Sequence, residues 1–396
     1  MKLRSVLKHC GIAFAIASSP LVQAQDIKLG FNGDLSASPS AEAGKAGLLG
    51  IQAAIEDINA AGGVSGRKLV LVIRDDQSQP PKSIQNMVDL IDNEKVAAVF
   101  GPTNSGNALA WRHIPNQKKI VSMGMIGAGT DITKPMSPGA DNYMFRVSMV
   151  DREQIAALVA YAVKSGTKKI GLMVETTGFG QGGLKDMQEL LKLHGVQPLA
   201  EEKFAVGDTD MTSQLNKMRA AGVDTVLVWA QGTPTAQLVR SMDKINYFPT
   251  FLSSWAADNP SFFDAAGKAL VGKPLFMRTM LDPSTPAQQK LFARISPKLS
   301  APSSFTFVSH GYDATLVLAA AIKQAGSIDG VKMREALEDL KEPVVGVMKT
   351  YNKPFSKTRH EGLLASDLVF AKWSEDKIVP YTDPILKSMT AADFKR

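Results

Sequence analysis

The sequence predicts an α/β protein of two lobes, each built on a doubly wound parallel sheet. Short apolar runs alternate with longer amphipathic segments along most of the 396 residues. Strands that alternate with helices indicate parallel sheets covered by helices on both faces. The chain is too long for one such sheet, so we expect two lobes. No segment rich in Pro, Gly or Ser separates them, and we therefore expect several chain crossings between the lobes.

The first part of the chain shows the alternation most clearly. Residues 26–31 place three apolar side chains on one side, as a strand should. Residues 41–59 carry apolar residues at helical spacing and end at Ala60-Ala61-Gly62-Gly63, which is a helix stop. The same pattern predicts, in order, strand 68–74, helix 81–92, and strands 96–100, 120–123, 169–174 and 225–229.

Two other segments have separate roles in the predicted architecture. Tyr143-Met-Phe-Arg146 follows a Pro-Gly break and is predicted to be the first crossing between lobes. Near the end, residues 368–373 and 377–381 flank a short polar turn and predict a terminal hairpin.

The first 24 residues have the features of a signal peptide. Basic residues precede a short apolar run at 11–17, and Val22-Gln23-Ala24 resembles a cleavage site. That run is far shorter than the roughly 20 apolar residues of a membrane-spanning helix. We therefore expect export to the periplasm with cleavage near Ala24. Cleavage removes the only cysteine, Cys10, and three of the seven net positive charges.

Composition and motifs argue against several classes of function. Basic residues mostly alternate with acidic ones, unlike the basic stripe of a nucleic-acid-binding protein. No G-x-S-x-G motif occurs. Of the five histidines, His9 would be removed with the signal peptide, and none of the other four has a His or Cys partner at metal-ligand spacing. We therefore expect no enzyme activity, no catalytic residue, no metal site and no cofactor.

A glycine-rich run at residues 178–183 supports an alternative function. It fits G-x-G-x-x-G, follows the strand at 169–174, opens a helix, and has Glu201 near the spacing of a ribose-binding acid. This local pattern is typical of a dinucleotide-dependent oxidoreductase. A glycine-rich helix start also lets a loop approach any ligand closely, so the motif alone is a weak signal.

Non-covalent capture of a small molecule is the third possibility. Ligands of open parallel sheets lie beyond the carboxyl ends of the strands, which here are followed by small polar loops. Thr103-Asn104-Ser105-Gly106 precedes a helix, and Ser105 either caps that helix or helps its free N–H groups bind an anion. Ala128-Gly129-Thr130 is a second such loop, and two loops from neighbouring strands are suited to hold one carboxylate. The loops that we expect at the ligand are 33–40, 101–107, 124–130, 176–183, 230–235 and 253–259.

Several short motifs follow one another in a specific order and spacing. They are Gly33-Asp-Leu-Ser36, Ala53-Ala-Ile-Glu-Asp-Ile-Asn-Ala-Ala-Gly-Gly63, Asp75-Asp76, Gly101-Pro102, Gly178-Phe-Gly180, Gly311-Tyr-Asp-Ala314 and Phe355-Ser-Lys-Thr-Arg-His360. Together they resemble the solute-binding proteins of ABC importers, of the leucine/isoleucine/valine-binding type. The resemblance covers nearly the whole chain after the signal peptide. It implies a type I periplasmic binding protein, with three hinge crossings and closure around a ligand in the cleft.

The resemblance also implies lobe boundaries and partners. The expected first lobe comprises residues 26–145 and 282–346, and the second comprises 146–281 and 347–396. We expect a monomer that delivers a small carboxylate-bearing solute to a membrane permease and binds no nucleic acid. A receptor domain that senses the solute without transporting it is a further alternative.

The resemblance assigns eight candidate ligand-binding residues. Ser105, Ala128 and Thr130 match residues that hold the ligand carboxylate, and Asn104 adjoins them. Phe179 matches an aromatic of the second lobe, with Trp229 and Trp255 on loops that face it. Each aromatic is equally well explained as core packing. Asp258 either reaches a ligand ammonium or caps the next helix.

Two departures from the amino-acid binders leave the solute open. Their second lobe supplies a carboxylate to the ligand ammonium, where this chain has Ala256 or Ala257. In the first lobe, Ala43 stands where they tend to place an aromatic. An uncompensated ammonium in a closed cleft costs several kcal/mol. The candidate solutes are therefore a branched-chain or other hydrophobic amino acid, or an aromatic acid without an amine.

Overall fold

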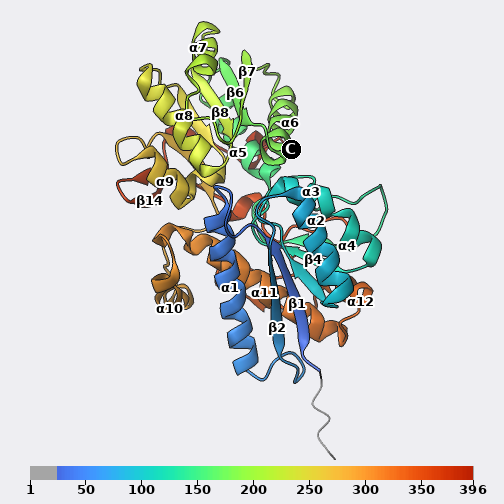
Figure 1. Cartoon of the computed structure of the whole chain (residues 1–396). Helices are drawn as coiled ribbons and strands as arrows, with labels where there is room; N and C mark the ends of the chain where they lie inside the picture. Colours follow the sequence, from blue (N-terminus) through green and yellow to red (C-terminus); the bar gives the residue numbers. More distant parts are fainter. Residues whose placement is uncertain (1–24, 396) are drawn as a thin grey trace, which may run out of the picture.

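The computed structural model describes residues 25–395, which form two lobes, one above the other in Figure 1. The first lobe has a sheet of strand order β2-β1-β3-β4-β5, and the second has the order β14-β13-β10-β9-β8-β6-β7. Within these two sheets, as described, neighbouring strands are parallel except at β13, which runs antiparallel to both β10 and β14. The predicted fold of two α/β lobes on largely parallel sheets is confirmed. The predicted signal peptide and Cys10 lie outside the described residues.

The first lobe contains the elements predicted for the start of the chain. Its sheet strands are β1 (Ile27–Gly33), β2 (Leu69–Asp75), β3 (Ala98–Phe100), β4 (Val121–Gly124) and β5 (Met144–Arg146). Its helices are α1 (Ala41–Ala60), α2 (Pro80–Val88), α3 (Ser105–Trp111), α4 (His113–Lys118), α10 (Pro286–Ile295), α11 (Phe305–Ala325) and α12 (Gly330–Glu338). The predicted helix 81–92 corresponds to α2 and the π-helical turn Asp89–Asn93 that follows it.

Glycines allow the two longest helices of this lobe, α1 and α11, to pack backbone against backbone. A Cβ on Gly50 would lie 2.0 Å from the carbonyl oxygen of Val308, and one on Gly311 would lie 2.1 Å from that of Gly47. By length and composition, α11 with the turn before it is apolar enough to cross a membrane. However, 83% of its most apolar 18-residue stretch is buried inside the protein. Its hydrophobicity is therefore that of a core helix.

The second lobe contains the remaining elements. Its strands are β6 (Ile170–Glu175), β7 (Ala200–Phe204), β8 (Thr225–Trp229), β9 (Thr250–Ser253), β10 (Pro274–Arg278), β13 (Val369–Ser374) and β14 (Lys377–Pro380). Its helices are α5 (Asp151–Lys164), α6 (Gly178–Leu193), α7 (Thr212–Ala220), α8 (Gly232–Lys244), α9 (Pro260–Ala266) and α13 (Pro384–Ser388). Strands β6, β8 and β10 are buried along their whole length, as helices on both faces require. The predicted terminal hairpin corresponds to β13 and β14.

The chain passes between the lobes after β5, after β10 and before β13. The last passage follows a small hairpin of β11 (Val344–Val345) and β12 (Thr350–Tyr351). The sequence places residues 347–396 with the second lobe. The Asp313 carboxylate of α11, however, accepts hydrogen bonds from the N–H of Val347 at 2.7 Å and the hydroxyl of Tyr351 at 2.9 Å. This hairpin is thus bonded to the first lobe.

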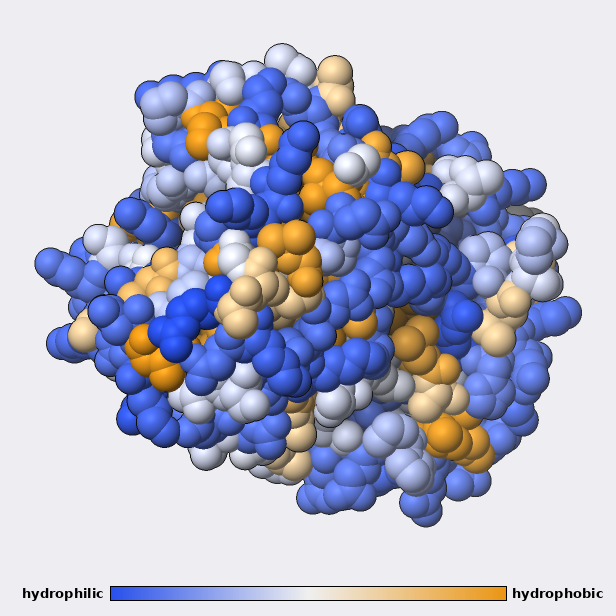
Figure 2. All heavy atoms as spheres, turned by 90° about the horizontal axis from the view of Figure 1, so that it is seen from above, coloured by the Kyte–Doolittle hydropathy of each residue, from blue (hydrophilic) through white to orange (hydrophobic). Residues whose placement is uncertain are grey.

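The surface in Figure 2 is mostly hydrophilic, with apolar residues in small separate groups. Such scattered groups are normal on a protein surface and mark no docking site. The space between the lobes is therefore the stronger candidate for a functional site.

Candidate functional site

A cavity lies between the lobes. Its first-lobe wall is formed by Pro39, Ser40, Ala43, Thr103, Asn104, Ser105, Ile126, Ala128 and Phe307. Its second-lobe wall is formed by Phe179, Gln231, Gly232, Trp255, Ala256 and Asn259. Most of these residues follow the carboxyl ends of the parallel strands, where the topology of open sheets predicts a ligand. All six loops that the sequence singled out contribute to the lining.

The cavity is apolar and lined by uncharged side chains. Among the described residues, none of those that line it is Asp, Glu, Lys, Arg or His. Three long helices begin at its wall: α1 after Ser40, α6 with Phe179 as its second residue, and α8 after Gln231. Free N–H groups and the helix dipole favour negative charge at such ends. The cavity therefore suits an apolar molecule with an anionic group.

Ser105 is placed to donate a hydrogen bond into this cavity. It is the first residue of α3, and the preceding Asn104 occupies the N-cap position without a capping side-chain bond. Ser105 Oγ accepts a hydrogen bond from the N–H of Gly129 at 3.0 Å. A hydroxyl has one proton besides its acceptor lone pairs, so the proton of Ser105 remains for a ligand. The bond to Gly129 joins the two loops that the sequence expected to converge on a carboxylate.

Asn104 connects three loops at the first-lobe wall. Its Nδ2 donates to Ser78 Oγ at 2.9 Å and to Ser40 Oγ at 3.1 Å. Asn104 therefore holds Ser40, at the start of α1, against the wall.

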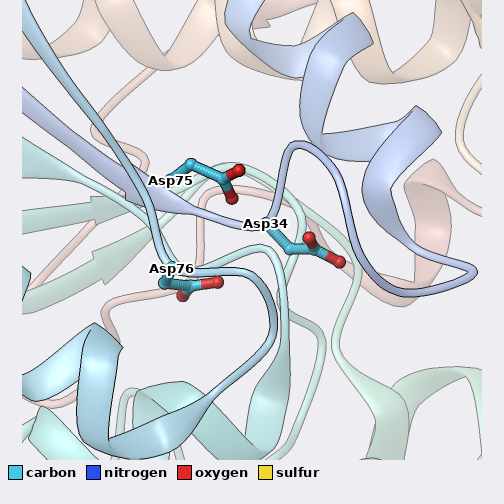
Figure 3. A group of neighbouring side chains, drawn as sticks. All are labelled: Asp34, Asp75 and Asp76. Carbon is cyan, nitrogen blue, oxygen red and sulfur yellow. The ribbon is translucent and has the colours of Figure 1, made fainter.

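Three neighbouring carboxylates stiffen the same loops (Figure 3). Asp34 follows β1 and accepts hydrogen bonds from the backbone of residues 36–38. Asp75 ends β2 and accepts from the N–H of Leu35 at 3.0 Å, whereas Asp76 accepts from Asn107 Nδ2 of α3 at 2.8 Å. Burial raises the pKa of Asp76, and its hydrogen bonds act in the opposite direction. Protein donors thus satisfy the cluster, which orders the loops of the cavity wall.

The predicted aromatic residues differ in their positions. Phe179 and Trp255 line the cavity, and the Trp255 ring lies edge-on to Phe307 at a centroid distance of 5.3 Å. Trp229 does not line it, because it ends β8 beneath α6 and is 1% exposed. A Cβ on Gly183 would lie 2.1 Å from the Trp229 ring. Trp229 thus packs behind Phe179, at a ring distance of 5.9 Å.

The structure also keeps Thr130 out of the cavity lining. Its Oγ1 donates to Asp186 Oδ2 of α6 at 2.5 Å and accepts from the N–H of Arg152 at 3.0 Å. Thr130 therefore joins the first lobe to helices of the second lobe.

Asp258 is turned away from the cavity into a buried ion pair. Asn259, not Asp258, caps α9, by accepting a hydrogen bond from the N–H of Ser261 at 3.0 Å. Asp258 is fully buried, and its Oδ2 lies 3.4 Å from Arg278 Nε. Burial raises the pKa of Asp258 to about 7, and the charge of Arg278 opposes that rise. Asp258 therefore already has a cationic partner, and it does not line the cavity.

This ion pair predicts a pH-dependent stability effect. Arg278→Met should lower the free energy of unfolding by about 3–5 kcal/mol at pH 8, because it leaves a buried carboxylate unpaired. The folded-state pKa of Asp258 lies above its unfolded value, so the folded protein favours the protonated form. Removing the Arg278 charge raises this pKa further, so the charge of Asp258 differs between the two folded proteins only above about pH 7. The loss therefore grows as the pH rises above 7, and at pH 5, where both folded proteins hold a neutral carboxyl, it should be about 2 kcal/mol or less.

Denaturant titration at pH 5 and pH 8 measures both losses. The matched control is Arg240→Met, which removes an exposed arginine of the same lobe. It should change stability by a similar small amount, within about 0.5 kcal/mol, at either pH. A loss for Arg278→Met that is equal at the two pH values contradicts the prediction.

Close packing explains most of the glycine-rich run at 178–183. A Cβ on Gly178 would lie 2.7 Å from the Cα of Gly106, and one on Gly180 would lie 2.0 Å from the carbonyl oxygen of Glu175. Gly183 leaves room for Trp229, as described above, whereas a Cβ on Gly182 would meet nothing within 4 Å. Three of the four glycines are thus required by neighbours within the protein. The motif therefore needs no dinucleotide to explain it.

The lobes touch at several points around the cavity. The Gly106 and Gly178 backbones meet, and Ser261 Oγ donates to the carbonyl oxygen of Pro39 at 3.2 Å. On α6, Lys185 Nζ lies 3.3 Å from Asp131 Oδ2. Contacts from three different loops describe a closed arrangement of the two lobes.

Some lining residues were not among the sequence-predicted candidates. Gln231, Asn259 and Ser40 lie in loops that the sequence singled out, so their position at strand ends was the available signal. Phe307 is different, because it belongs to the long buried helix α11 and no local pattern distinguishes it from its apolar neighbours.

Comparison with known proteins agrees with this geometry. The family model described as periplasmic binding protein matches residues 26–377. The Leu/Ile/Val-binding protein BraC3 of Rhizobium johnstonii is 24% identical over 368 residues, which are 92% of this chain and 96% of that protein. These relatives are named as binding proteins and not as enzymes, so the oxidoreductase alternative is not favoured.

Solved structures show the same architecture. A type 1 periplasmic binding protein from Bordetella pertussis superimposes with a TM-score of 0.78 at 25% identity, covering 90% of this chain and 99% of that one. A solute-binding protein of an ABC transporter from R. palustris, in complex with 4-hydroxybenzoate, gives a TM-score of 0.73 at 19% identity, covering 90% and 95%. The two lobes, the interlobe cavity and the family match lead to one assignment. The chain belongs to the periplasmic binding protein family, as a non-catalytic type I solute-binding protein of the leucine/isoleucine/valine-binding type.

Proposed function

We propose that this protein captures a small, partly apolar carboxylic acid between its lobes and delivers it to the membrane permease of an ABC importer. The observation that carries the proposal is the hydrogen bonding of Ser105, whose Oγ accepts the N–H of Gly129 and keeps its own proton. Its hydroxyl proton is free beside an apolar, uncharged cavity at whose wall three long helices begin. A carboxylate is the group that such donors stabilise best.

The lining favours an acid without an amine. Ala43 and Ala256 line the cavity, and Asp258, the acid nearest in sequence, is paired with Arg278. A ligand ammonium would therefore lack a carboxylate partner at the wall. The flat faces of Phe179 and Trp255 suit a ring. An aromatic acid is the first choice, and a hydrophobic amino acid, as named for the BraC3 relative, is the second.

A thermal-shift panel tests the proposal. The probes are benzoate, 4-hydroxybenzoate, leucine and 4-methylpentanoate, which is leucine without its amine. Benzyl alcohol, which has no carboxylate, is the control. A bound acid at 100 times its Kd should add about 2.7 kcal/mol to the free energy of unfolding, and the alcohol should add almost nothing. Stabilisation by leucine but not by 4-methylpentanoate would show that the amine is required. Stabilisation by no acid, or by a nicotinamide dinucleotide instead, contradicts the proposed function.

The cellular role follows from the same proposal. The chain is exported, cleaved near Ala24, and acts in the periplasm as a monomer whose closed form the permease recognises. Deleting it should abolish high-affinity uptake of the radiolabelled acid that the panel identifies. Unchanged uptake, together with loss of a transcriptional response to that acid, would favour a sensing receptor domain.

A further inference from the structure

The side-chain amide of Gln231, at the second-lobe wall, is hydrogen-bonded to a buried glutamate. Gln231 precedes α8 and is 7% exposed. Its backbone N–H donates to Glu175 Oε2 at 2.8 Å, and its side-chain Nε2 donates to Glu175 Oε1 at 3.1 Å. Glu175 is fully buried at the end of β6 and also accepts a hydrogen bond from the hydroxyl of Thr177.

These bonds fix the orientation of the Gln231 amide. A carboxylate accepts hydrogen bonds and does not donate them, so Glu175 selects the NH₂ end of the amide. The carbonyl oxygen, Oε1, must then point away from Glu175. An amide whose N–H bonds a carboxylate is also polarised, which makes its oxygen a better acceptor.

Oε1 has no strong donor among the described residues. Ser38 Oγ, across the cleft, lies 3.4 Å from Oε1, which is a long distance for a hydrogen bond. Ser38 has a single hydroxyl proton, and its Oγ lies much closer to Asp34 Oδ2, at 2.5 Å, and to Ser40 Oγ, at 2.6 Å. That proton is therefore donated to the Asp34 carboxylate, which can only accept, and Ser40 supplies the proton of the other short bond. Gln231 lines the cavity, and its Oε1 is an oriented acceptor that has only this long contact with a protein donor.

We propose that Gln231, positioned by Glu175, selects solutes with a hydroxyl group by accepting a hydrogen bond from it at the second-lobe wall. This inference rests on the proposed function, because it requires the carboxylic acid to lie in the cavity with its carboxylate at Ser105. Gln231 then meets the part of the solute that faces the second lobe. The acceptor is neutral and the lining is uncharged, so its partner is a hydroxyl and not an ammonium.

An acceptor of this kind discriminates between otherwise similar solutes. If a solute without a donor fills the cavity, Gln231 Oε1 is closed off from water and left without a partner. A site built to bond a hydroxyl therefore rejects the analogue without it far more strongly than an apolar pocket discriminates by size. We expect 4-hydroxybenzoate to bind at least about tenfold more tightly than benzoate.

The test measures this ratio of dissociation constants by calorimetry in the wild type and in Gln231→Met. Methionine keeps the length of the side chain but has no amide. The ratio should fall to about twofold or less, with most of the loss in the affinity for 4-hydroxybenzoate. The matched control is Gln181→Met. Gln181 Nε2 donates a hydrogen bond to the backbone oxygen of Glu175 at 3.1 Å, but Gln181 does not line the cavity. In Gln181→Met the ratio of the dissociation constants for benzoate and 4-hydroxybenzoate should stay as in the wild type.

Glu175→Gln tests the positioning role. A glutamine there both donates and accepts, so the Gln231 amide is free to turn over. The ratio should then narrow, whereas a purely structural effect would weaken the two acids equally and leave the ratio unchanged. If this variant does not fold, Gln231→Met alone decides.

Every other outcome overturns the inference. If Gln231→Met weakens both acids equally, Gln231 is a packing residue, and if it changes neither dissociation constant, Gln231 takes no part in recognition. A wild-type preference for leucine over 4-methylpentanoate that Gln231→Met abolishes assigns the acceptor to an ammonium. If the wild type binds none of these four acids, the proposed function itself fails, and this inference fails with it.

Discussion

Ser105→Ala should weaken binding of the carboxylic acid by about 1.5–3 kcal/mol, which is roughly a 10- to 150-fold rise in Kd. Ser105 Oγ already accepts the N–H of Gly129, so its proton is the group left to reach the ligand carboxylate. Hydrogen bonds to charged groups are worth about twice as much as neutral ones. Isothermal titration calorimetry with the acid identified by the thermal-shift panel measures the change directly.

The matched control is Ser241→Ala in α8. Ser241 Oγ also accepts a backbone N–H, that of Met211 at 3.0 Å, but its proton is donated to the carbonyl oxygen of Gln237 at 2.8 Å. This serine is buried and does not line the cavity. Ser241→Ala should therefore lower the free energy of unfolding and leave Kd unchanged. If Ser105→Ala behaves in the same way, its hydroxyl only joins two loops of the first lobe.

Gly178→Ala should weaken binding by preventing full closure. Its Cβ would lie 2.7 Å from the Cα and 3.3 Å from the N of Gly106, across the cleft. Backbone atoms do not move aside as a flexible side chain does, so the closed form is strained while the open form is not. Overpacking of this kind costs about 1–3 kcal/mol, or roughly a 5- to 150-fold rise in Kd. Small-angle scattering should show less compaction on ligand addition than in the wild type.

Gly182→Ala is the control for this prediction. It lies on the same helix, and its Cβ would meet nothing within 4 Å. Neither glycine has a positive φ, so alanine is compatible with both backbones and adds up to about 1 kcal/mol of helix propensity. Gly182→Ala should therefore bind and close as the wild type does. Equal affinities for the two variants would show that the Gly106–Gly178 contact does not belong to the ligand-bound state.

The fold was predictable because its signals are local. Apolar runs of strand length followed by amphipathic segments are present wherever a buried strand and its covering helix occur, and β1, α1, β6 and β8 lie close to their predicted ranges. The position of the site was predictable for a related reason. In a parallel sheet the carboxyl ends of all strands lie at the same edge. The loops that follow the strands in sequence therefore form the cavity wall.

The chemistry of individual side chains was less predictable. Ser105, Ala128, Asn104, Phe179 and Trp255 line the cavity, but their proposed roles rest on the family pattern. Trp229 is the last residue of a parallel strand, next to the loop that lines the cavity, yet it packs beneath α6, because Gly183 leaves room for its ring.

The sequence by itself determined the two-lobed α/β architecture and the loops that surround the cavity, because hydrophobic periodicity and the succession of strands and helices depend on neighbours in the chain. The export signal stays a prediction from the sequence. Only the tertiary structure decided which polar groups remain available to a ligand. Thr130 is bonded to Asp186, Asp258 is paired with Arg278, and the amide of Gln231 is turned by Glu175. Each partner is 20 or more residues away, on another element. A local pattern shows that a residue lies at a strand end, but its charge state and free hydrogen-bonding atoms depend on what the fold brings against it.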